Sequence, residues 1–155
     1  DFKVTVSYPD EQVYANLYVG AVESSVTGGA TTGAKVKELG SVAVSDNELS
    51  SVSGKNLIVV GGSCVNSVAA TLLGSSAPLC GADWESKTGA GSGNFLIETF
   101  ARTGGKVATL VAGYNAGDTT NAVKYLTTQA VDTATGKKYI GTSSISATLQ
   151  TTSTT

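Results

Sequence analysis

A strand, a glycine turn and a helix follow one another in residues 56–74, and this unit constrains the fold more than any other feature of the sequence. The short apolar run Leu57–Val60 ends at two glycines, a pattern typical of a strand buried on both faces. Beyond the turn, apolar residues recur at helical spacing as far as Leu73, and Gly74 suits a helix C-cap. The unit predicts an α/β fold with residues 57–60 at the centre of the sheet.

The next stretch of chain is predicted to be a long connection and then a second helix. Residues 75–92 are rich in Gly and Ser, and a connection of this length in a compact domain needs something to fix it. Ser92 is predicted to cap a helix that carries Phe95, Leu96 and Phe100 and ends at the following glycine pair.

The remaining C-terminal residues give one more strand, one more helix and an extended end. Residues 106–113 form a second apolar run, which predicts a second buried strand. Asp118 is predicted to cap a third helix, and residues 138–149 return to an extended pattern. Residues 151–155 are a Thr/Ser tail, predicted to be flexible.

Extended segments dominate the N-terminal region. Residues 2–8 alternate apolar and polar side chains, residues 13–22 are rich in aromatic and β-branched types, and residues 35–44 are also extended by pattern. Ser45 and Glu48 have capping-box spacing, which predicts a short helix through about Val52.

Taken in chain order, these elements predict a single α/β domain over residues 1–150. Its sheet is mixed and partly parallel, with flanking helices and antiparallel edge strands at the N- and C-terminal ends.

The chain has two cysteines, Cys64 and Cys80. With no His and no third thiol to complete a metal site, a disulfide between them is the leading interpretation. It would close a loop of about 16 residues and place the protein in an oxidising compartment. The alternative is a pair of buried free thiols in a cytosolic protein, and the position of Cys64 next to a helix start keeps that alternative open.

Composition argues against several functional classes. Charged residues are only 14% of the chain, Ser and Thr are about a quarter, and the net charge is -2 with no basic run. Nucleic acid is therefore an unexpected partner, and no apolar run has the length of a membrane span. The surface is instead one of small uncharged groups that repel their own copies weakly.

Candidate chemical residues are few, and no catalytic residue, metal or cofactor is predicted. The chain has no His, so Ser63 or Cys64 lacks a general base, and the glycine turn is an incomplete phosphate-binding fingerprint. Asp83 and Glu85 could act as paired carboxylates in glycoside hydrolysis or hold Ca²⁺, but a solvated loop is the simpler interpretation. Trp84 could stack on a sugar, but core packing is the simpler interpretation.

Three stretches together resemble the C-terminal domain of archaeal surface-layer (S-layer) proteins. They are residues 4–15, residues 56–66 and residues 106–119, and the resemblance covers most of the chain. The family commonly has Pro where Ser63 stands, and a second cysteine in the loop matching Cys80, which supports the disulfide.

The resemblance implies an exported protein that tiles the cell surface as an ordered array, with no catalytic residues. We therefore expect an extracellular structural subunit whose main partner is itself, with surface glycans as a further candidate partner. Unpaired strands in the N-terminal segment or near residues 140–149 are expected to pair between subunits. The alternative is a cell-wall or carbohydrate-binding module, since bacterial wall-anchoring repeats share the strand, turn and helix pattern. An enzyme with a Rossmann-like site ranks third.

Overall fold

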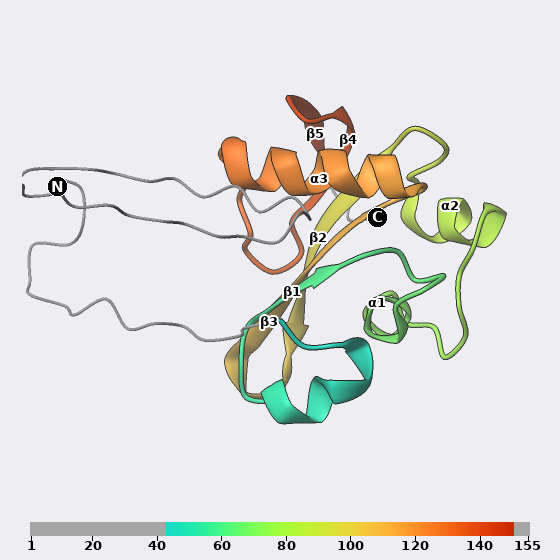
Figure 1. The fold of residues 1–155 in the computed structure, drawn as a ribbon. Helices are drawn as coiled ribbons and strands as arrows, with labels where there is room; N and C mark the ends of the chain where they lie inside the picture. Colours follow the sequence, from blue (N-terminus) through green and yellow to red (C-terminus); the bar gives the residue numbers. More distant parts are fainter. Residues whose placement is uncertain (1–42, 151–155) are drawn as a thin grey trace, which may run out of the picture. The chain divides into compact units, whose positions relative to one another are not determined.

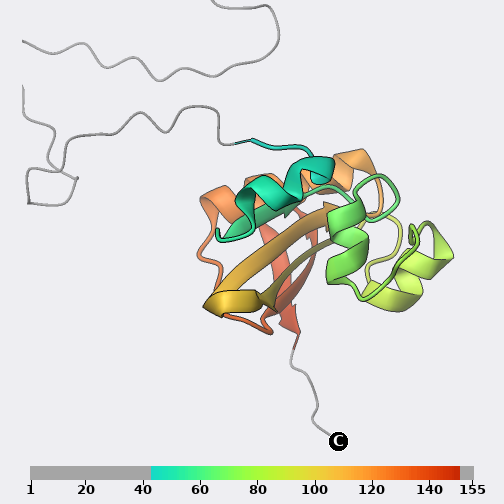
Figure 2. The same cartoon turned by 90° about the horizontal axis from the view of Figure 1, so that it is seen from below.

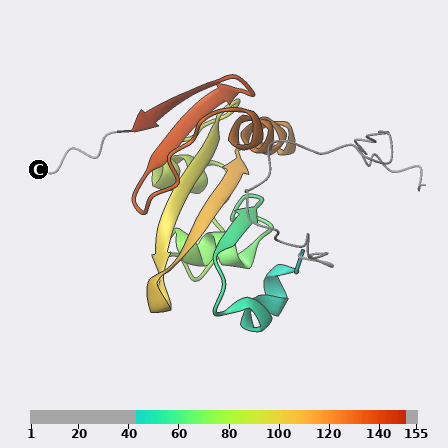
Figure 3. The same cartoon turned by 90° about the vertical axis from the view of Figure 1, so that its left-hand side faces the viewer.

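The computed structural model describes residues 43–150, which fall within one compact unit built on a five-stranded mixed sheet. The strands lie in the order β1-β3-β2-β4-β5, and Figure 3 shows them side by side from red β5 to green β1. Their bounds are β1 Leu57–Val60, β2 Phe95–Arg102, β3 Lys106–Gly113, β4 Lys138–Ser143 and β5 Ser146–Gln150.

The predicted fold class is confirmed, because β1 pairs with β3 in parallel while the other neighbouring strands pair antiparallel. The C-terminal edge is the predicted antiparallel one, formed by the β4–β5 hairpin. The strands predicted over residues 2–8, 13–22 and most of 35–44 lie outside the described residues, as does the tail 151–155. A single domain over 1–150 therefore stays a prediction.

The helices are η1 Asp46–Val52 and η2 Thr103–Gly105, both 3₁₀, together with α1 Ser67–Leu72, α2 Ala82–Thr88 and α3 Ala116–Thr128. Figure 1 shows α3 crossing one side of the sheet, while α1 and α2 lie apart from α3. Figure 2 shows η1 beside α1. The short helix predicted from Ser45 is present as η1, and Ser45 and Glu48 form its capping box.

Alternating side chains divide the core into two apolar layers, one on each face of the sheet. On β3, Leu110 packs with residues of α1 and α2, such as Val68 and Trp84. Its neighbour Val111 packs on the opposite face with Ala122 of α3. The central strands β3 and β2 are therefore covered on both faces over much of their length, which explains the apolar runs within their sequences.

The prediction of a helix over Phe95, Leu96 and Phe100 is wrong, since these residues belong to β2. Strand β2 pairs with β3 along its full length and with β4 over half of it. Because both faces of β2 are buried, its sequence lacks the alternation that marks a half-exposed strand, and the apolar run also fits a helix.

Two smaller corrections concern helix ends and the long connection. The N-cap of α3 is Asn115, with Asp118 three residues on as the second member of a capping box. The connection over residues 75–92 contains the helix α2, which the sequence does not predict. Helix α2 has only seven residues, of which Trp84 and Thr88 are buried. About two turns are too few to show the periodic spacing of apolar residues that predicts a helix.

Candidate functional site

The predicted disulfide between Cys64 and Cys80 is present in the structure, with a Cα–Cα distance of 5.0 Å. A second tie lies beside it, because the buried hydroxyl of Ser63 donates to the carbonyl oxygen of Leu79 at 2.8 Å. The two ties join the turn before α1 to the connection before α2. The hydrogen bond gives Ser63 a structural role.

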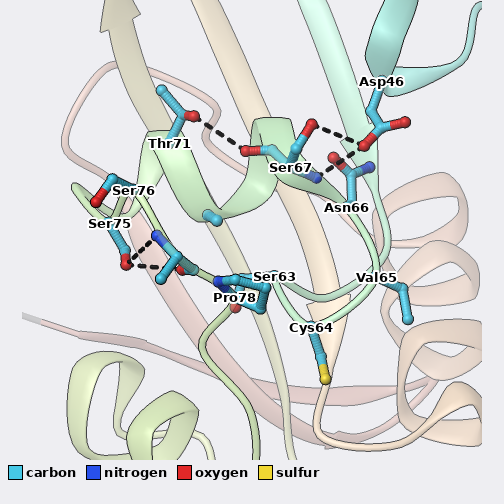
Figure 4. A pocket seen from close by; sticks show the side chains of 12 residues that line it. Asp46, Ser63, Cys64, Val65, Asn66, Ser67, Thr71, Ser75, Ser76 and Pro78 are labelled. Atoms are coloured by element: carbon cyan, nitrogen blue, oxygen red, sulfur yellow. Dashed lines mark hydrogen bonds between the residues drawn. The ribbon is translucent and has the colours of Figure 1, made fainter.

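A shallow hollow of about 270 Å³ lies beside the disulfide, between the start of α1 and the connection that follows it (Figure 4). Most of its hydroxyl groups donate hydrogen bonds within the chain. These are Ser63, Ser67, Thr71 and Ser75. Of the described residues that line the hollow, none is aromatic, so the stacking surface typical of sugar sites is missing from its walls.

Asp46 holds η1 against α1 at the rim of this hollow. Its carboxylate accepts from the backbone amide and the hydroxyl of Ser67 at 2.9 and 2.7 Å (Figure 4). These hydrogen bonds, the amide first, lower the pKa of Asp46 below its ordinary value. The ionised carboxylate of Asp46 therefore joins η1 to α1, and this contact has a structural role.

The other candidate chemical residues are placed apart from the hollow. Trp84 is buried in the core, so its side chain is a packing residue. Asp83 and Glu85 lie in the first turn of α2. Residues 43–150 contain no cluster of three His, Cys, Asp or Glu side chains that would hold a metal ion.

Strand β1 forms an open edge of the described sheet, and not its centre as the sequence predicted. The amide of Gly61 donates to the carbonyl of Val111 on β3, so by alternation the amides of Ile58 and Val60 point away from β3. No strand among residues 43–150 pairs with that side of β1. Its side chains are also uncovered on one face, with Ile58 68% and Val60 50% exposed.

Strand β5 forms the opposite open edge. Within the described part of the chain it pairs only with β4, and four of its five residues are exposed. Neither β1 (Leu-Ile-Val-Val) nor β5 (Ser-Ala-Thr-Leu-Gln) contains a charged residue or a proline. Charged residues and prolines are among the devices that proteins use to keep edge strands from pairing with other chains.

No known family model, curated protein or solved structure matches the chain. Residues 43–150 contain no helix with the length and apolarity needed to cross a membrane.

Proposed function

We propose that this chain is a structural subunit that assembles with its own copies into an extracellular array, tube or filament of the S-layer kind, without catalysis. The observation that carries the proposal is the pair of uncharged edges, both open among residues 43–150, at the two ends of one sheet. Two different edges on one subunit permit head-to-tail contacts, which generate open polymers when the rotation between copies does not close a ring.

Two further features support this function. The disulfide favours an oxidising compartment outside the cytosol, where such bonds persist. A charged share of only 14% keeps electrostatic repulsion between neighbouring copies low. The hollow beside the disulfide supplies little for the alternative of a carbohydrate-binding module, because most of its hydroxyls are already donating within the chain.

The test is negative-stain electron microscopy of the purified full chain over a range of protein concentrations, with and without Ca²⁺ and with and without reductant. The proposal expects regular sheets, tubes or filaments in at least one oxidised condition. Monodisperse single particles throughout would exclude self-assembly under these conditions and leave the binding-module alternative in its place.

A further inference from the structure

We infer that the subunit contact is a direct pairing of β1 of one copy with β5 of the next, which continues the sheet from subunit to subunit. This inference rests on the proposed function and specifies its interface. Three properties of the two edges support it: their relative direction, the face on which their apolar side chains lie, and their length.

The direction of the strands makes this contact an antiparallel one. Strand β3 is parallel to β1, β2 runs opposite to β3, β4 runs opposite to β2, and β5 runs opposite to β4. Strand β5 is therefore antiparallel to β1 within a subunit. A second copy placed beside the first in the same orientation offers its β5 to β1 antiparallel, the more stable of the two pairings per residue.

The exposed apolar side chains of both edges lie on the same face of the sheet. Ile58 and Val60 stand opposite Thr109 and Val111 of β3, and Val111 belongs to the core layer under α3. At the other edge, Leu149 stands opposite Tyr139, a residue of the same layer. Cross-strand partners share a face, so Ile58, Val60 and Leu149 all lie on the α3 side.

These faces fix which residues meet. If the sheet continues from copy to copy, the α3 sides of neighbouring copies lie on the same face. A shift of one residue in the β1–β5 pairing would therefore move every side chain to the wrong face. The register that pairs all four residues of β1 places Ile58 opposite Leu149 and Val60 opposite Ala147 of the neighbouring copy. Each exposed apolar residue of β1 would then have an apolar partner.

Asn66 marks one end of this contact. Its side-chain amide donates to the carbonyl oxygen of Val60 at 3.2 Å, which occupies the last outward acceptor of β1. The outward amides of Ile58 and Val60 and the carbonyl of Ile58 remain for a partner strand. The contact is therefore short, which suits an assembly built from many weak and repeated interfaces.

Cysteine cross-linking between two single variants of the full chain tests this pairing. Isotope-labelled I58C is mixed with unlabelled L149C under conditions that give polymers, treated with a mild thiol oxidant, and analysed by mass spectrometry of the linked peptides. The matched control mixes V65C with L149C, since Val65 is 84% exposed but lies outside the strands. Urea midpoints of the variants show whether each is folded.

The inference expects mixed dimers linked through positions 58 and 149, formed at least about tenfold faster than in the control because the paired strands raise the effective thiol concentration. A predominance of I58C homodimers would overturn it in favour of a two-fold β1 contact. An I58C thiol shielded from maleimide in dilute monomer would also overturn it, since the edge would be covered within the chain. Ordered polymers without the 58–149 link would refute this interface while leaving the proposed function standing.

Discussion

Removal of the Cys64–Cys80 disulfide should destabilise the protein by about 3 kcal/mol. The half-cystines are 16 residues apart, and closing a loop of that size lowers the entropy of the unfolded chain by an amount worth about 3 kcal/mol at 25 °C. Both cysteines are exposed, so replacing them with Ser in C64S/C80S removes little buried surface. The loss measured by urea unfolding therefore reports mainly on loop closure.

The neighbouring hydrogen bond of Ser63 provides a second perturbation of the same loop. S63A removes its donor to Leu79 and should cost about 1 kcal/mol. Because both ties fix the same connection, the triple variant S63A/C64S/C80S should depart from additivity. If C64S/C80S lost less than about 1 kcal/mol, the disulfide would not be fixing the loop in the way that the chain-entropy argument requires.

Two further predictions concern close packing and charge. G141A should lower the free energy of unfolding in urea by about 1–3 kcal/mol, because the added Cβ would meet the buried ring of Phe95. The control is G54A, whose added Cβ would meet nothing within 4 Å. Equal losses in the two variants would contradict this packing. Burial raises the pKa of Glu98 despite the opposing effect of Lys138, so this site favours folding most at low pH. The stability of E98Q relative to wild type should therefore increase as pH rises through the folded pKa of Glu98, and a pH-independent difference would contradict it.

The acidic groups near η1 act with the opposite sign. Hydrogen bonds from Ser67 and from Ser45 lower the pKa values of Asp46 and Glu48, respectively. Each contributes stability that is present above the ordinary carboxyl pKa and lost as pH falls through its lowered folded pKa. Together with Glu98, these groups make the acid limb of the stability curve a sum of opposing contributions.

The sequence predicted those elements whose local signals agree with their tertiary setting. The capping box at Ser45 and the apolar run of β3 each follow from short-range patterns that the fold leaves intact. The disulfide was predicted because the chain has only two cysteines and no His to form a metal site with them. The strand β2 was missed because burial on both faces removes the alternation that separates strand from helix.

The candidate site was harder to predict, because it depends on strand order. The apolar run of β1 is the usual signature of a central strand. Only the topology of the sheet within residues 43–150 shows that β1 lies at an edge there, with Ile58 and Val60 exposed. The C-terminal segment containing β5 was expected to pair between subunits, and the structure leaves its outer edge open within residues 43–150. Strand β1 carries neither the charge nor the proline that commonly marks an edge strand, so its sequence held no signal of its position.

Electron microscopy of a charge-bearing edge variant tests the central claim of assembly through the sheet edges most directly. I58K places a cation on the open face of β1, and V65K adds the same charge at an exposed position outside the strands. Wild type and V65K should form ordered polymers under the same conditions, while I58K should remain as folded single particles, because a lysine on an edge strand opposes pairing. Polymers of I58K with the same order and abundance as wild type would contradict the account.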